Sequence, residues 1–159
     1  MSYDEFRAQF AEGRCHHVLV AGFLAEQAAA SLRTQLAAAG LVRFDRPDRG
    51  RYEYNGELAI PSVFDDLRAI AEELVQRPLR VEQVCWERLR HRDYQLTKDD
   101  ARRRPIAESH LELTLDLSAT ETGQAEVVYT DGRESWVVQQ IPGAISIVDK
   151  EPWLFRYAR

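Results

Sequence analysis

Two imidazoles and one carboxylate in this chain could bind a metal ion together. His91-x-Asp93 is a His-x-Asp pair, and His110 follows it in the sequence. Together these side chains would supply three metal ligands. The alternative is that His91 and Asp93 lie in a turn or on a solvent-exposed strand edge, where they bind no metal.

A lysine and an aspartate follow two residues apart. Lys98 and Asp100 would lie on the same face of a strand, because successive side chains of a strand point to opposite faces. A lysine ammonium has no lone pair at neutral pH and carries the same sign of charge as a metal ion, so it does not replace a histidine ligand. The two side chains could instead form an internal ion pair.

Arginines gather on both sides of this segment. Arg88, Arg90 and Arg92 would share one face of a strand, and residues 102–104 are three further arginines. A phosphate or a dicarboxylate would find a bidentate partner there. The alternative, which we favour, is a solvated outer face whose arginines pair with nearby acids.

The composition is that of an ordinary globular domain. The chain has 159 residues, of which 45% are hydrophobic and 30% charged, and it is long enough to bury a core without disulfides. Cys15 and Cys85 are too few for a disulfide framework. The net charge of -5 argues against nucleic acid as the main partner. Neither a membrane-spanning run nor a secretory signal is present, so we expect no membrane association and a cytoplasmic location.

The first half of the chain predicts helices between short strands. A strand is expected over residues 15–21, and a helix follows it and ends at Gly40. A second helix begins at Pro61, where proline is tolerated, and ends at Arg77. Its apolar stripe consists of Phe64, Leu67, Ile70, Ala71 and Leu74. Residues 45–50 are expected to form a polar turn or loop, and residues 51–60 one or two strands.

From Leu79 onward the pattern predicts mostly sheet. Leucines at 111, 113, 115 and 117 alternate with polar residues, which predicts a strand with one buried and one wet face. Asp131-Gly132 predicts a hairpin turn, and Pro142-Gly143 a turn into an apolar strand over residues 144–148. The last strand is expected over residues 153–158. These elements predict an α+β fold in which helices pack on one sheet of an antiparallel sandwich or jelly roll.

The order of these elements and the segment from Asp93 to Asp100 resemble the prolyl-hydroxylase-like 2-oxoglutarate/Fe(II) dioxygenase superfamily. The resemblance implies an antiparallel double-stranded β-helix, or jelly roll, with two N-terminal supporting helices. It covers residues 1–159 as a single 2-oxoglutarate/Fe(II) oxygenase-like domain, with helical support in residues 1–78 and jelly-roll strands in residues 79–159.

The resemblance also implies cofactors and site residues. In that family a tyrosine and a leucine-like residue precede a metal-binding His-x-Asp pair, and these positions match Tyr94, Leu96, Lys98 and Asp100. Asp100 is therefore the implied metal ligand, with Lys98 at the first histidine position, and Tyr94 and Arg156 are the implied cofactor contacts. Fe(II) and 2-oxoglutarate are the implied cofactors, and the implied reaction is hydroxylation of an unidentified small-molecule or protein substrate.

Two departures from the family pattern lead to a second hypothesis. Lys98 replaces the first metal histidine, and no histidine follows His110 to serve as the distal ligand. The chain would then be a degenerate or a C-terminally shortened member, and a shortened sheet would expose an edge that favours a homodimer. The alternative function is a non-catalytic jelly-roll binding or assembly module, without cofactors, that holds a Lys98–Asp100 ion pair in the former metal site.

Overall fold

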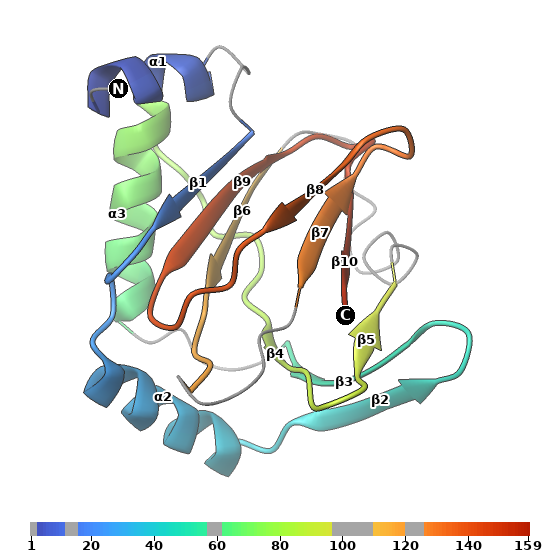
Figure 1. Ribbon diagram of the computed structural model, residues 1–159. Coiled ribbons are helices and arrows are strands. Elements are labelled where there is room, and N and C mark those ends of the chain that lie inside the picture. The colour runs from blue at the N-terminus through green and yellow to red at the C-terminus, as the bar shows by residue number, and fades with distance from the viewer. Residues whose placement is uncertain (1–2, 12–15, 57–61, 97–109, 120–125) are drawn as a thin grey trace.

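The computed structural model describes residues 3–11, 16–56, 62–96, 110–119 and 126–159 (Figure 1). Lys98, Asp100, Cys15 and the arginines at 102–104 lie outside the described residues. The described part contains the helices α1 (Tyr3–Ala11), α2 (Glu26–Ala38) and α3 (Val63–Val75) and strands that are all paired antiparallel. The fold is therefore α+β, as predicted, although α1 was not expected from the sequence.

The two predicted helices end where the sequence indicates. Gly40, just beyond α2, has a φ of +76°, a left-handed conformation that glycine adopts at little cost. Gln76 ends α3 with a φ of +54°. Asp65 and Asp66 lie in the first turn of α3, where their charges suit the helix dipole.

One sheet has three strands in the order β1-β9-β6. Its members are β1 (His17–Val20), β9 (Ile145–Lys150) and β6 (His110–Leu115). Within the described residues, this sheet contains the expected strands over residues 15–21 and 144–148 and the strand expected from the alternating leucines at 111–117, which ends at Leu115.

The larger sheet has the order β2-β3-β5-β10-β7-β8, and β4 pairs with β3 beside this path. Its strands are β2 (Val42–Arg46), β3 (Gly50–Asn55), β4 (Trp86–Arg88), β5 (Tyr94–Gln95), β7 (Val127–Thr130), β8 (Ser135–Val138) and β10 (Phe155–Ala158). The sequence placed the turn at residues 45–50, but β2 and β3 pair as far as Arg46↔Gly50. The expected loop is therefore a shorter turn, and a strand precedes it.

Helices α1 and α3 cover the outer face of the three-stranded sheet (Figure 1). Leu67 and Leu74 of α3 and Phe10 of α1 pack with Ile145 and Ile147 of β9, and each of these five side chains is at most 3% exposed. This cluster confirms the apolar stripe predicted for the second helix. Among the described helices, none is long and apolar enough to cross a membrane.

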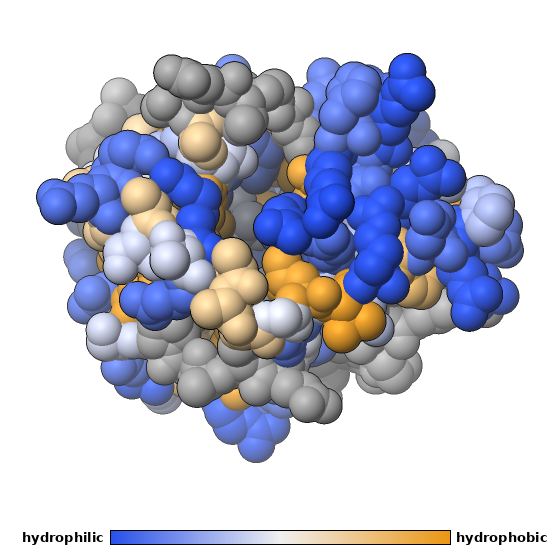
Figure 2. Space-filling model, turned by 90° about the horizontal axis from the view of Figure 1, so that it is seen from below, coloured by the Kyte–Doolittle hydropathy of each residue, from blue (hydrophilic) through white to orange (hydrophobic). Residues whose placement is uncertain are grey.

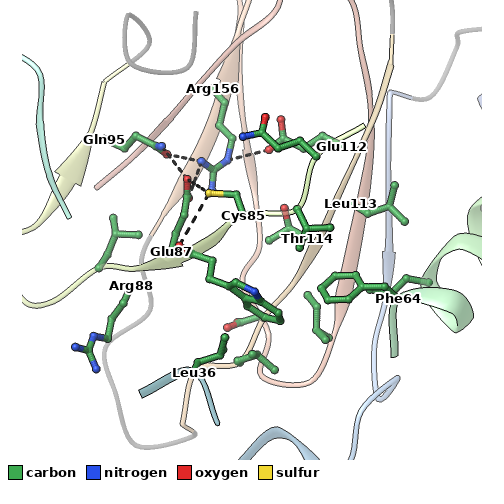
Figure 3. A pocket seen from close by; sticks show the side chains of 18 of the residues that line it. Leu36, Phe64, Cys85, Glu87, Arg88, Gln95, Glu112, Leu113, Thr114 and Arg156 are labelled. Carbon is green, nitrogen blue, oxygen red and sulfur yellow. Dashed lines mark hydrogen bonds and ion pairs between the residues drawn. The ribbon is translucent and has the colours of Figure 1, made fainter. Parts of the chain in front are cut away.

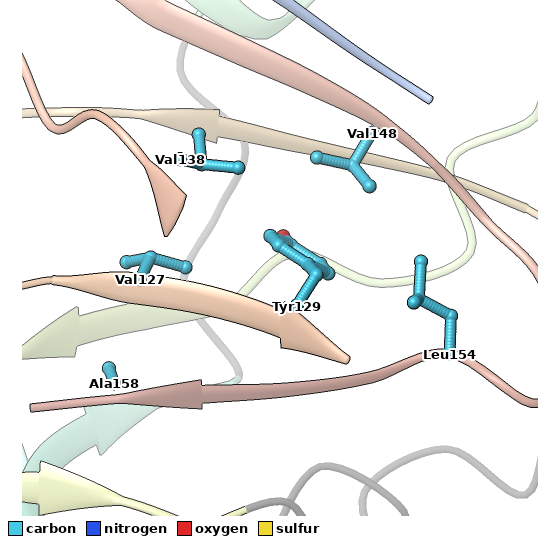
Figure 4. Close-up of a cluster of buried hydrophobic side chains, with 6 residues drawn as sticks. All are labelled: Val127, Tyr129, Val138, Val148, Leu154 and Ala158. Carbon is cyan, nitrogen blue, oxygen red and sulfur yellow. The ribbon is translucent and has the colours of Figure 1, made fainter. Parts of the chain in front are cut away.

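A second apolar cluster fills one side of the space between the two sheets (Figure 4). It contains Val127, Tyr129, Val138, Val148, Leu154 and Ala158, each at most 5% exposed. We call this group the closed-side cluster. It joins β9 of the smaller sheet to β7, β8 and β10 of the larger one, and so holds the two sheets together on this side.

The predicted turns connect these strands. Asp131 Oδ1 accepts the backbone N–H groups of Arg133 and Glu134, both at 2.7 Å, and closes the β7–β8 hairpin. Gly143 has a φ of +73°, and a Cβ there would collide with the backbone carbonyl of Leu24. The same glycine accepts a hydrogen bond from Leu24 N–H at 2.9 Å, which ties the turn before β9 to the segment between β1 and α2.

The alternation along β6 has a different meaning from the one predicted. Leu111, Leu113 and Leu115 pack toward the helices, as expected. Glu112 and Asp116 were expected on a wet face, yet the Glu112 side chain is 12% exposed and Asp116 only 9%. The polar face of β6 turns toward the space between the sheets, because the second sheet covers it.

Candidate functional site

A cleft of about 1720 Å³ opens between β6 and the segment of residues 77–95 that contains β4 and β5. Leu36 of α2 and Phe64 of α3 line its apolar part. Figure 2 shows the molecule from below, with hydrophobic and hydrophilic side chains meeting around a hollow in this face. The close-up in Figure 3 shows the polar part, where Arg156, Glu87, Gln95 and Glu112 point toward one another.

Arg156 is the centre of this polar group. Its side chain is 9% exposed, and its Nη1 donates to Gln95 Oε1 and, at 3.3 Å, to Glu87 Oε2. Its Nε lies 3.2 Å from Glu112 Oε1. The guanidinium of β10 therefore contacts side chains from three other strands, β4, β5 and β6.

Glu112 also pairs with a second cation. Lys150 Nζ lies 3.2 Å from Glu112 Oε2, and the lysine side chain is 5% exposed. Tyr129 donates its hydroxyl to Glu112 Oε1 at 3.0 Å. We call Glu87, Gln95, Glu112, Lys150 and Arg156 the buried ion-pair network. The two positive charges of this network equal its two negative charges. Such a balance is needed in the interior, because an unpaired charge away from water is costly.

Strand register explains why these residues meet. Arg156 lies opposite Tyr129 in the β10–β7 pair, and Gln95 lies opposite Ala158, two residues along β10 from Arg156. Residues two apart on a strand share a face, so Arg156 and Ala158 both point between the sheets. Lys150 lies opposite His110 in the β6–β9 pair, and Glu112 is two residues along β6 on the same face.

The donor set of this interior does not suit Fe(II). The related chemistry needs two histidines and one carboxylate around the metal. In the part of the chain that the structure describes, no three His, Cys, Asp or Glu side chains are grouped closely enough to hold a metal ion. The interior holds a guanidinium and an ammonium instead, and both repel a metal cation.

The combination of His91, Asp93 and His110 is not a metal site. Asp93 is 6% exposed and accepts from Arg43 Nη1 at 2.6 Å and Nη2 at 2.7 Å, and also from Arg90 N–H at 2.9 Å. The hydrogen bond from Arg43 holds the pKa of Asp93 below its ordinary value of 3.8. Asp93 therefore fastens the turn after β4 to β2, and His91 is exposed in that turn.

The other two histidines belong to β1 and the residue before it. The His16 ring stacks on Trp136 with 5.9 Å between ring centroids. Burial lowers the pKa of His17 from its ordinary value of 6.5, and the charge of His16 lowers it by a smaller amount.

The arginine run is divided between two environments. Arg88 Nε donates to Glu53 Oε2 at 2.6 Å, and Arg90 pairs with the other oxygen of the same carboxylate. The prediction of arginines paired with acids is confirmed for these two residues. Arg92 does not share their face, because it lies in a turn with a φ of +69°.

Tyr94 and Arg156 are the two implied cofactor contacts that the structure describes. Tyr94 donates its hydroxyl to the Pro47 carbonyl at 2.9 Å, which ties β5 to the β2–β3 turn. Arg156 lies in the interior, where its hydrogen bonds go to this chain's own side chains.

Sequence reasoning missed the partners of Arg156. Glu87, Gln95, Glu112 and Lys150 lie on different strands, and their convergence depends on sheet order. A signal was present, because Lys150 and Arg156 are cations on strands that are otherwise largely apolar. A cation at such a position needs a buried partner.

Comparisons with known proteins support the fold. No model of a known protein family matches the sequence, and no curated protein matches it. Among solved structures, a prolyl-4-hydroxylase from Pseudomonas putida is similar, with a TM-score of 0.65 and 15% sequence identity. The match covers 96% of this chain and 89% of that one. At this identity the likeness shows that the two chains share an overall fold, and it leaves the activity to be argued from the site.

Proposed function

We propose that this protein is a non-catalytic binding module built as a single domain on the double-stranded β-helix of the 2-oxoglutarate oxygenases. The observation that carries the proposal is the buried ion-pair network around Arg156. The guanidinium is 9% exposed and contacts two carboxylates and one amide that reach it from three other strands or strand segments. A cation held in this way opposes the binding of Fe(II) between the sheets.

The energetics of the network support a permanent role for Arg156. Removing one partner of a buried ion pair leaves an uncompensated charge and costs about 3–5 kcal/mol. An iron ion bound beside Arg156 would therefore have to displace a cation that the fold needs. The sequence points the same way, because Lys98, a cation, stands at the histidine position that the resemblance implies, two residues before the matched Asp100.

The competing function is 2-oxoglutarate/Fe(II)-dependent hydroxylation of an unidentified substrate. The similarity to the Pseudomonas putida prolyl-4-hydroxylase favours it. Asp100 would then be a metal ligand, and Tyr94 and Arg156 would contact 2-oxoglutarate. Glu87 and Glu112, which lie beside Arg156, would repel that dicarboxylate.

Anaerobic titration with Fe(II), with and without 2-oxoglutarate, separates the two functions. The unaltered protein should release no saturable binding heat in calorimetry, even at millimolar iron. Lys98→His restores the histidine that the family pattern implies, and Arg133→His adds an imidazole on the exposed β7–β8 hairpin as a matched control. Tight, stoichiometric iron binding by the unaltered protein would contradict the proposal and favour the oxygenase.

A further inference from the structure

The strand β2 (Val42–Arg46) forms an outer edge of the larger sheet (Figure 1). Among the described strands it pairs with β3 alone, in an unbroken register of five residue pairs. Four of its five residues are exposed, and the fifth, Phe44, is half-buried. Alternate residues of an edge strand direct their backbone N–H and C=O groups outward, so a further strand can pair with them.

The sequence of β2 lacks two features that commonly prevent pairing between sheet edges. No proline occurs in Val-Arg-Phe-Asp-Arg, and the pairing with β3 contains no bulge. Charged side chains are a third such feature, and β2 has three of them. Their signs, however, are ordered so that they complement a second copy of the same strand.

We infer that β2 pairs in antiparallel orientation with β2 of a second copy of this chain, so that the two larger sheets become continuous. The two-fold axis of such a pair is perpendicular to the sheet, and it keeps corresponding faces on the same side. Only registers that place residues of the same face opposite each other are therefore allowed. The inference goes beyond the proposed function and does not depend on it, because β2 contributes no residue to the buried ion-pair network.

Charge selects one of the allowed registers. With Phe44 on the two-fold axis, Arg43 of each copy lies opposite Asp45 of the other, which gives two pairs of opposite charge. The next allowed register in one direction places Arg43 opposite Arg43, and the next in the other direction places Asp45 opposite Asp45. Directly opposed like charges destabilise a strand pair, so the register centred on Phe44 is favoured.

The ion pairs within one copy extend this match. Arg43 Nη1 lies 2.6 Å from Asp93 Oδ2, and Asp45 Oδ1 lies 3.2 Å from Arg51 Nε. Across the axis these pairs would form two rows of alternating sign, in which Asp93 and Arg43 of one copy are followed by Asp45 and Arg51 of the other. The Asp45 side chain is 52% exposed, so it is accessible to a second arginine.

The other face of β2 supplies apolar contacts to the same register. Phe44 lies opposite its own copy, and cross-strand aromatic pairs stabilise sheets. Val42 is 58% exposed, and the methylene groups of Arg46 from the second copy can cover it. Two five-residue strands bury less than the roughly 1,200 Å² of a stable interface. We therefore expect a weak dimer with a dissociation constant in the micromolar range.

Sedimentation equilibrium of the full chain between about 10 µM and about 1 mM tests the inference, because this range covers weak interfaces. A reversible monomer–dimer equilibrium is expected. Hydrogen exchange of the backbone amides, followed by nuclear magnetic resonance at both ends of this range, locates the contact. Outward amides of β2 should exchange severalfold more slowly at the high concentration, whereas amides of β8, at the other end of the same sheet, should keep their rates.

Charge variants test the register. Asp45→Arg opposes two pairs of arginines and should weaken the dimer at least about tenfold at low salt. Glu134→Arg makes the same change of charge on the exposed β7–β8 hairpin and should alter the dissociation constant less than about twofold. Val42→Glu places a carboxylate opposite Arg46 of the second copy and should tighten the dimer about threefold, whereas Val42→Arg should weaken it by a similar factor. Circular dichroism of each variant checks that the fold is retained.

Four results would overturn the inference. A chain that stays monomeric at about 1 mM would leave this edge to a strand of another protein. Equal weakening by Asp45→Arg and Glu134→Arg would show an effect of net charge alone. Slower exchange at β8 instead of β2 would place the contact elsewhere, and equal effects of Val42→Glu and Val42→Arg would contradict the register. Iron binding in the calorimetric titration would overturn the proposed function alone.

Discussion

The two sides of the space between the sheets are built differently. On one side, the closed-side cluster joins β9 to β7, β8 and β10 through apolar side chains that are at most 5% exposed. On the other side, β6 and residues 77–95 stand apart across a cleft, and charged side chains reach between the sheets. The difference teaches that apolar packing joins the sheets on one side, whereas paired charges join them on the other.

The largest effect should come from removing the central cation of the buried ion-pair network. Arg156→Ala leaves Glu87 and Glu112 with less positive charge around them, and we expect a loss of about 3–5 kcal/mol in the free energy of unfolding. Urea denaturation measures this loss. Arg133→Ala removes an exposed arginine and should change the free energy of unfolding by about 0.5 kcal/mol or less. Equal effects of the two substitutions would show that the network does not stabilise the fold.

Leucine truncation tests the two sides directly. Leu154 belongs to the closed-side cluster and is 2% exposed, so Leu154→Ala should cost about 2–5 kcal/mol of unfolding free energy. Leu36 is half-buried on the cleft wall, and Leu36→Ala should cost about 1 kcal/mol, because less apolar area is lost there. Thermal and urea unfolding give both values. A larger cost at Leu36 would reverse the comparison.

The hydroxyl of Tyr129 links the two sides, since its ring is in the closed-side cluster and its oxygen donates to Glu112 at 3.0 Å. Tyr129→Phe keeps the ring and removes one hydrogen bond to a carboxylate. We expect a loss of about 1.5–3 kcal/mol in the free energy of unfolding. Unchanged stability would mean that Glu112 is fully satisfied by Arg156 and Lys150.

The smallest expected effect is a pH dependence at the outer end of the cleft wall. The hydrogen bond from Arg43 lowers the pKa of Asp93 in the folded state below 3.8. The stabilisation is therefore present above the ordinary carboxyl pKa and is lost as the pH falls through the lower, folded-state pKa. Arg43→Met should make the acid-induced loss of stability less steep in this range, measured by thermal unfolding at a series of acidic pH values. A steeper loss would contradict the assigned role.

Much of the fold was predictable because its signals are local. The apolar stripe of α3, the Asp131-Gly132 hairpin and the turn at Gly143 each depend on a few neighbouring residues, and the structure has all three. The strand β2 was missed because Val42 and Phe44, on either side of Arg43, are its only apolar residues and make a short pattern. Helix α1 was missed as well, because its small apolar face gives a weak periodic signal.

The site was predictable only in part, because it depends on contacts between distant strands. Arg156 was named from the sequence, but its partners come from residues 87, 95 and 112 through sheet order. Glu112 was assigned to a wet face, since alternation shows that two faces differ without showing what covers each one. The implied ion pair of Lys98 with Asp100 stays a prediction, because both residues lie outside the described part of the chain.

The central claim of the proposed function is that the buried guanidinium of Arg156 opposes metal binding between the sheets. Nuclear magnetic resonance of the Arg156 side-chain N–H groups, assigned with an Arg156→Lys variant, tests this claim most directly. The account predicts signals protected from exchange with water, and no selective broadening of them when paramagnetic Mn(II) and 2-oxoglutarate are added. Saturable broadening of these signals by the two together would place a metal beside Arg156 and contradict the account.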